Sequence, residues 1–148
     1  MKNIMQYEII NDLRLIIEYY NGEFHIDELI HFKEGVGEDS NYNPEYNIIH
    51  DFGESHFGVE FSDIKKYVDF LLRNSCHVGK RKVTMITSTP NQVVTAMGFE
   101  MQKQNLPVES KVTSTFDAAA SFVELSEEAH REIEKRINKM KTARQYNL

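Results

Sequence analysis

The chain alternates between apolar runs with the period of a strand and apolar positions with the period of a helix. Residues 4–10 and 13–20 are rich in β-branched and aromatic side chains, and Asn11 and Asp12 form a turn signal between them, so the sequence predicts a β-hairpin that ends at Asn21 and Gly22. A helix is then predicted at residues 25–33, because apolar positions recur there at helical spacing and Lys33 falls on the same stripe. Gly35 and Gly37 would end this helix.

Three strands follow in the rest of the chain, at residues 46–52, 82–87 and 108–115. The first leads through residues 53–61, a polar loop or short extended segment, into an amphipathic helix that Ser62 would cap. The second leads into a helix at residues 92–104, with Pro90 suited to the first helical position. A short helix at residues 117–125 and a longer one from Ser126 complete the chain.

This alternation of strands and helices predicts an α/β fold. We expect a mixed, mostly parallel five-stranded sheet with an N-terminal β-hairpin and with helices covering it. The 148 residues divide into an α/β domain at 1–125 and a C-terminal helical extension at 126–148. The extension carries an apolar stripe at Ile133, Ile137 and Met140; this stripe packs back on the domain or docks to another subunit, and both alternatives stay open.

Composition restricts the class of partner. The net charge of −6 would repel phosphate backbones, so nucleic acid is not an expected partner. Residues 131–144 hold six basic and two acidic residues, which predicts a solvated helical face or, alternatively, a basic docking arm. No apolar run reaches the roughly 18 residues of a membrane span, and no secretory signal is recognised. Cys76 is the single cysteine, which fits a reducing compartment. We therefore expect a cytoplasmic protein without a membrane partner.

The residues whose side chains are best suited to bind a ligand lie at or just after the ends of the strands predicted at 46–52 and 82–87. In a parallel sheet the segments after neighbouring strands meet at one rim, where ligands bind. Hydroxyl, amide and carboxylate groups there would satisfy helix N–H groups, or would bind a small polar ligand or a partner's side chain. The candidate binding residues are Asp51, Glu54, Ser55, Ser62, Ser88, Thr89 and Asn91.

A second set of residues suggests acid–base or metal chemistry. His50, Asp51, Glu54 and His56 form the densest group of possible metal ligands. Their spacing matches no established zinc motif, so we expect no metal and no cofactor. No nucleophile, base and orienting group can be assembled from the sequence, and an enzyme is therefore the less expected alternative.

Three segments together resemble a known family. They are Asp51 at a strand end followed by a helix that starts with serine, the strand from Val83 to Ser88 running into residues 90–97, and the ending at residues 115–123. Their order resembles the STAS-like (SpoIIAA-like) domains of anti-sigma-factor antagonists, sulfate transporters and small bacterial relatives, over about residues 5–125. In the antagonists a partner kinase phosphorylates a serine at the start of this helix; the resemblance implies Ser62 as the possible phosphorylation site, although the glycine that follows it in the family is absent here.

The resemblance and the candidate residues lead to one expected function. We expect a non-enzymatic regulatory or binding module that presents the loop after the third strand and the start of the next helix to a protein partner or a small ligand. One alternative is a metal-assisted or acid–base enzyme that uses His50, Asp51, Glu54 and His56. Another is a structural protein that oligomerises, for example as a homodimer, through its tail helix.

Overall fold

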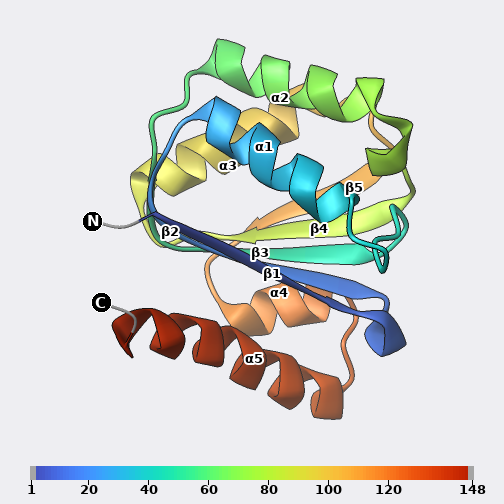
Figure 1. Cartoon of the computed structure of the whole chain (residues 1–148), viewed down its shortest axis with the longest axis vertical. Helices are drawn as coiled ribbons and strands as arrows, with labels where there is room; N and C mark the ends of the chain where they lie inside the picture. The colour runs from blue at the N-terminus through green and yellow to red at the C-terminus, as the bar shows by residue number, and fades with distance from the viewer. Residues whose placement is uncertain (1–2, 147–148) are drawn as a thin grey trace.

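A computed structural model describes residues 3–146, and the side chains of residues 3–143, and it confirms the α/β fold (Figure 1). The sheet has the strand order β1-β2-β3-β4-β5; β1 runs antiparallel to β2, and the other neighbours are parallel. The strands are β1 (Ile4–Ile10), β2 (Leu15–Phe24), β3 (Asn47–Phe57), β4 (Arg81–Ile86) and β5 (Val108–Thr113).

Helices cover both faces of this sheet, as Figure 1 shows. One face carries α1 (Ile26–Gly37), α2 (Phe61–Arg73) and α3 (Pro90–Gln102), and the other carries α4 (Phe116–Phe122) and α5 (Glu127–Tyr146). Two short 3-10 helices complete the chain: Asn11–Leu13 connects β1 to β2, and Ser75–His77 lies between α2 and β4. The helices α1, α2 and α3 each connect two neighbouring parallel strands in the same direction, so right-handed crossovers place all three on one face; α4 and α5 follow β5 and cover the other.

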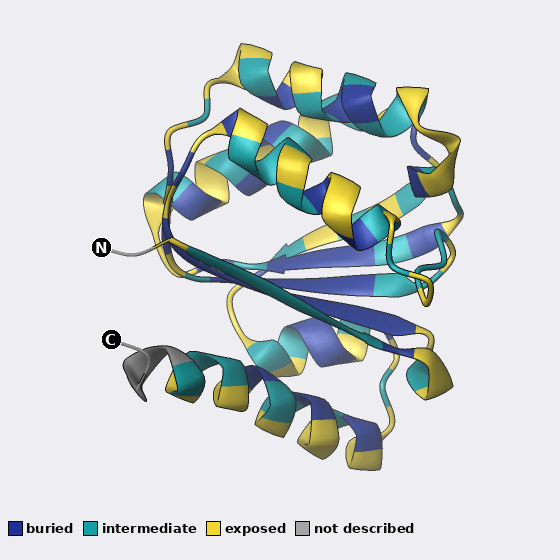
Figure 2. Cartoon of the chain, viewed as in Figure 1, coloured by how far each residue is buried: buried dark blue, intermediate teal, exposed yellow. Residues whose placement is uncertain are grey.

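The tail helix α5 packs on its own sheet. Ile133 and Ile137 are almost completely buried, in one cluster with Ile17, Ile49 and Ala119 (Figure 2). Of the two alternatives for the apolar stripe, the structure therefore shows the one in which it packs back. The predicted boundary at residue 126 falls directly before α5, where the Ala129 amide donates to Ser126 Oγ at 3.2 Å.

Two basic residues of α5 form ion pairs within the chain. Arg136 donates hydrogen bonds to Glu8 and Glu132, and Lys141 Nζ lies 3.0 Å from Asp51 Oδ2. Arg144, which belongs to the predicted basic face, lies outside the side chains that the structure describes.

The prediction for the ends of β2 and β3 was wrong. Both strands continue, to Phe24 and Phe57, past the glycines that were expected to end or follow them. A register shift lies between Tyr19 and Asn21, and Gly22 (φ +124°) and Gly53 (φ +49°) adopt positive φ angles beside it. A bulge of this kind lets two strands stay paired while one extra residue is accommodated. As a result, Asp51, Glu54 and Ser55 lie within β3 and not in a loop.

The predicted cap of α2 was also wrong. The helix begins at Phe61, and Glu60 is its N-cap: the Glu60 side chain accepts from the amide of Asp63, and the Asp63 carboxylate accepts from the Glu60 amide at 2.9 Å. This reciprocal capping box satisfies two N–H groups that the first turn would leave free. Ser62 is instead the second residue of the helix, with its side chain exposed. Similarly, α1 continues through Gly35 to end at Gly37.

Replacing Gly53 by alanine should destabilise the protein. A Cβ at this position would overlap the backbone carbonyl oxygen of Tyr20, and φ is +49°. We expect Gly53→Ala to lower the free energy of unfolding by about 1–3 kcal/mol in urea titrations, because neither the backbone strain nor the overlap is easily relieved.

Gly35 provides the matched control for this substitution. It lies in α1, is exposed, and has no neighbouring atom within 4 Å of the point that a Cβ would occupy. Gly35→Ala should therefore raise the free energy of unfolding by about 0.5–1 kcal/mol. Equal effects of the two substitutions would contradict the role assigned to the bulge.

Candidate functional site

The end of β4 lies beside the interior of β3, where Asp51 pairs with Ile86, the last residue of β4. Asp51, Glu54 and Ser88 line a cavity of about 410 Å³ there, together with Tyr19 and Lys141. The Ser88 hydroxyl donates to the carbonyl of Gly53 at 3.2 Å, which joins the two segments directly. Three of the seven candidate residues are therefore neighbours in space.

The carboxylate at this rim is already occupied by groups of its own chain. Asp51 is 5 % exposed; its Oδ1 accepts from the amide of Gly53 at 2.9 Å and its Oδ2 pairs with Lys141 at 3.0 Å. A ligand at Asp51 would have to displace Lys141. The rim therefore joins α5 to the sheet, and its chemistry is that of a satisfied ion pair.

The other four candidate residues lie away from this cavity. Asn91 pairs with the backbone of Phe57 in both directions, at 2.8 and 2.9 Å, and Thr89 caps α3 by accepting from the amide of Gln92 at 3.2 Å. Ser55 is buried in β3 and its hydroxyl has no hydrogen-bond partner within residues 3–143, whereas Ser62 is exposed on α2. Asn91 and Thr89 thus hold α3 against the end of β3.

Of the four residues of the enzymatic alternative, Asp51 and Glu54 line one cavity, whereas neither histidine lines it. His50 contacts residues beneath α1, whereas its neighbour Asp51 contacts α5 on the opposite face. Successive side chains of a strand point to opposite faces, which explains the separation. His56 is exposed. The two histidines and the two carboxylates are therefore not brought together at one site.

A polar cluster that the sequence did not predict lies beneath α1. It consists of Glu18 and Tyr20 from β2, Lys33 from α1 and His50 from β3, and we call it the buried cluster. Glu18 accepts hydrogen bonds from both Lys33 and Tyr20. Lys33 Nζ lies 3.0 Å from His50 Nε2, and Glu18 Oε1 lies 3.4 Å from the same nitrogen. All four side chains are buried.

Burial and mutual charge shift the pKa values in this cluster. Burial alone would raise the pKa of Glu18, but the charge of Lys33 and the hydrogen bonds outweigh it and lower that pKa. Burial lowers the pKa of Lys33, against the opposing effect of Glu18. Burial, followed by the charge of Lys33, lowers the pKa of His50 to about 4. The cluster is therefore an ion pair beside a neutral imidazole at neutral pH.

The hydrogen bonds of His50 indicate its tautomer. Nδ1 lies 3.2 Å from the carbonyl oxygen of Thr84, which can only accept, so Nδ1 carries the proton. Nε2 is then free to accept from the ammonium of Lys33. A neutral imidazole fixed in this way bridges the ion pair to β4.

A second set of buried polar groups adjoins the cluster. Arg81 donates to the Tyr42 hydroxyl at 3.1 Å and to the carbonyl of Asn43 at 2.7 Å, and Tyr42 in turn contacts His77 Nδ1 at 3.2 Å. Burial, then the charges of Lys33 and Arg81, lowers the pKa of His77 to about 4. The Nε–H group of Arg81 is buried and has no partner within residues 3–143.

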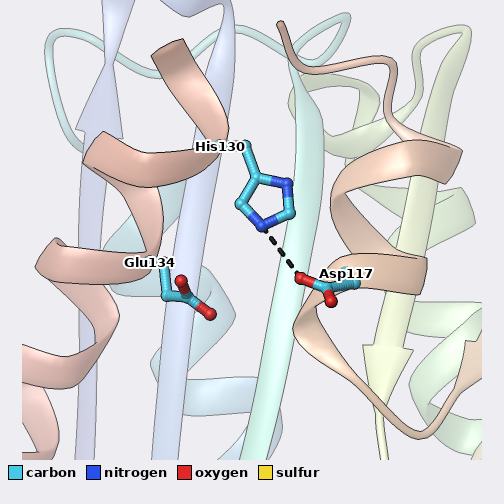
Figure 3. A group of neighbouring side chains, drawn as sticks. All are labelled: Asp117, His130 and Glu134. Atoms are coloured by element: carbon cyan, nitrogen blue, oxygen red, sulfur yellow. Dashed lines mark ion pairs between the residues drawn. The ribbon is translucent and has the colours of Figure 1, made fainter. Parts of the chain in front are cut away.

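One group of side chains has the donor types of a metal site. Asp117 of α4 and His130 and Glu134 of α5 face one another (Figure 3), and their ligand atoms all lie within 4.8 Å. One nitrogen and two carboxylates suit Zn²⁺ or Mn²⁺. However, Asp117 is exposed and its Oδ1 already lies 2.9 Å from His130 Nε2, so in this structure this contact joins the two helices.

None of the helices within residues 3–146 combines the length and the apolar character that crossing a membrane requires. No protein-family model matches the sequence, and comparison with curated proteins and with solved structures gives no significant match.

Proposed function

We propose that this chain is a non-enzymatic regulatory module of the STAS-like type that binds a partner protein through the start of α2 and the outer face of α3. The observation that carries the proposal is the distribution of exposed apolar side chains. Within residues 3–143 the exposed large hydrophobic side chains all lie in one place, which we call the α3 patch: Phe61, Val93, Val94, Met97 and Met101.

The members of the α3 patch form a continuous surface. Four of them recur along one side of α3, and Phe61 begins the neighbouring helix. The carbonyl of Phe61 accepts from Gln102 Nε2 at 2.8 Å, and its ring lies 3.9 Å from the position of a Cβ on Gly98. The absence of a side chain at Gly98 brings the two helices close enough for Phe61 to extend the patch.

The composition of the patch favours a protein partner. Charged residues make up 27 % of the chain, yet the single charged residue of α3, Glu100, pairs with Lys103 at 3.3 Å. Apolar patches without charge mark interaction sites, and the centres of protein interfaces are enriched in methionine and aromatic residues. A complementary partner would present an uncharged apolar surface of its own.

The patch also gives the candidate phosphorylation site a physical role. Ser62 follows Phe61 directly and its side chain is exposed. A phosphate there would bring about two negative charges to the edge of an apolar interface, and docking would then have to remove them from water. Phosphorylation of Ser62 is therefore proposed to weaken the complex.

A photo-crosslinking residue at position 94 tests the proposal in cells of the source organism. We expect a covalent adduct with a second protein, and we expect Met97→Glu or Met101→Glu to reduce its yield at least about tenfold, because a charge would be buried without a partner. The same crosslinker at Ser121, exposed on α4 at the opposite face, is the control.

Two results would count against this function. One is an adduct from position 94 that is no more abundant than the adduct from position 121. The other is an adduct with the mass of two copies of this chain, because a homodimer would replace the proposed partner.

A further inference from the structure

We propose that the space between the sheet and the helices α1, α2 and α3 is a binding site for a small monocarboxylate with a short apolar tail. The carboxylate would lie between Lys33 and Arg81, and the tail would lie among the aromatic and aliphatic side chains of the adjoining cavity. This proposal is independent of partner binding at the α3 patch.

Two adjoining cavities define the site. The larger, of about 80 Å³, is lined mainly by apolar side chains such as Leu29, Phe52 and Ala96. The smaller, of about 40 Å³, has mostly apolar walls, such as Val36 and Leu71, but Glu18, Arg81 and His77 also line it. Both are bordered by the same five residues: Lys33, His50, Tyr67, Val83 and Phe99. A molecule that occupies both would therefore meet Lys33 where the cavities adjoin, and Arg81 and Glu18 only in the smaller one.

The size of the apolar cavity limits the tail. A water molecule takes about 30 Å³ of the liquid, so 80 Å³ corresponds to a few small groups and not to a long acyl chain. Aromatic side chains surround this space, because Tyr20, Phe52 and Phe57 contact one another with centroid distances of 4.7 to 6.3 Å. Such walls favour a compact aliphatic tail.

The charges of the smaller cavity favour an anion. Lys33 and Arg81 are 6 % and 8 % exposed, and the only carboxylate that lines either cavity is Glu18, which is 0 % exposed. The histidines His50 and His77 are neutral at pH 7, since their pKa values are lowered to about 4. Two cations and one anion leave one buried positive charge in excess. A buried charge without a counterion is unfavourable, and a carboxylate would neutralise it.

One hydrogen-bond donor at the site has no acceptor in the described part of the chain. It is the buried Nε–H of Arg81, whose other nitrogens bind Tyr42 and Asn43. The hydroxyl of Tyr67, which borders both cavities, is a further donor at the site. Burial, followed by the charge of Glu18, raises the pKa of Tyr67 well above its usual value, so the hydroxyl keeps its proton. Charge-assisted bonds from such donors to a carboxylate are among the strongest available.

Titration of the intact protein with sodium salts of straight-chain acids tests the inference. We expect saturable binding of butanoate and hexanoate by calorimetry. We expect butanamide, which has the same size without the charge, and decanoate, which is too long, to bind at least about tenfold more weakly. Intermolecular NOEs from the ligand methyl group to Met85, which lines the apolar cavity, would locate the tail.

Two substitutions separate recognition from a structural role. Tyr67→Phe keeps the ring and should weaken butanoate binding several-fold and butanamide binding less, because the charged acceptor forms the stronger hydrogen bond, whereas Tyr46→Phe, which lies outside both cavities, should change neither. Ala96→Leu fills the apolar cavity and should abolish binding of hexanoate. Tyr67→Phe and Ala96→Leu leave the ion pair between Glu18 and Lys33 intact, so both variants are expected to fold.

The inference is overturned by equal binding of butanoate and butanamide, by an undiminished hexanoate affinity in Ala96→Leu, or by the absence of saturable binding. The last result would mean that ordered water alone satisfies Arg81.

Discussion

Replacing Lys33 by methionine is expected to lower the free energy of unfolding by about 3–5 kcal/mol, the cost of removing one partner from a buried ion pair. Methionine fits the space of the lysine stem, so the loss is electrostatic and not a loss of volume. Glu18 is completely buried and would keep only the hydrogen bond from Tyr20 and its contact with His50. Urea unfolding monitored by circular dichroism measures the effect.

A double substitution identifies the cause of this loss. In Glu18→Leu/Lys33→Met neither charge remains, and replacement of a buried pair by apolar residues of similar volume is often close to neutral. We therefore expect the double variant to be more stable than Lys33→Met alone. A double variant as unstable as the single one would mean that packing of the lysine stem, and not the charge, dominates.

An exposed ion pair serves as the control. Lys66 Nζ lies 2.7 Å from Asp27, and both side chains are more than half exposed. Water screens such pairs, and they contribute between zero and about 1 kcal/mol. If Lys66→Met costs as much as Lys33→Met, the buried cluster has no special energetic role.

The order of the elements could be predicted from the sequence because buried strands and helices leave different apolar patterns. The nearly continuous apolar run of β2, which is buried on both faces, and the one-sided stripes of α2 and α5 are direct consequences of their burial. The ends of β2 and β3 were missed because Gly22 and Gly53 look like turn residues, and only the pairing of the two strands shows that they form a bulge. The start of α2 was missed because the acidic residues Glu60 and Asp63 act as the capping box in place of Ser62.

The rim of the sheet was predictable for a topological reason, whereas the buried cluster was not. Parallel pairing of the strands brings Asp51 and Ser88 to the same edge of the sheet, and this does not depend on the contacts of their side chains. The buried cluster instead depends on which residues of distant elements face one another, and Glu18 and Lys33 are 15 positions apart. A weak signal was present, because Lys33 falls on the apolar stripe of α1 and Glu18 lies within an apolar strand. Charged residues at apolar positions are almost always paired when buried.

Stability should fall when the pH is lowered from about 6.5 to about 4. His50 is faced by Lys33, Glu18 and Arg81, and its pKa is lowered from the ordinary 6.5 to about 4, chiefly by burial and then by Lys33. Below pH 6.5 the unfolded chain therefore binds a proton that the folded protein does not, and protonation favours unfolding until the pH reaches the folded value. A pKa lowered from 6.5 to about 4 corresponds to about 3 kcal/mol of stability.

His77 acts in the same direction and over the same pH range, since its pKa is also lowered to about 4. Glu18, whose pKa is lowered below its ordinary value of 4.5, loses its contribution only at still lower pH. Urea titrations between pH 4 and 7 should therefore show a slope that His50→Gln makes shallower and that His50→Gln/His77→Gln nearly removes. NMR of the imidazole nitrogens in the folded protein provides a direct check, with Nε2 of His50 unprotonated at pH 6. A folded His50 that titrates near pH 6.5, or a stability that stays constant over this range, would show that the imidazole is accessible to water and not enclosed beside Lys33.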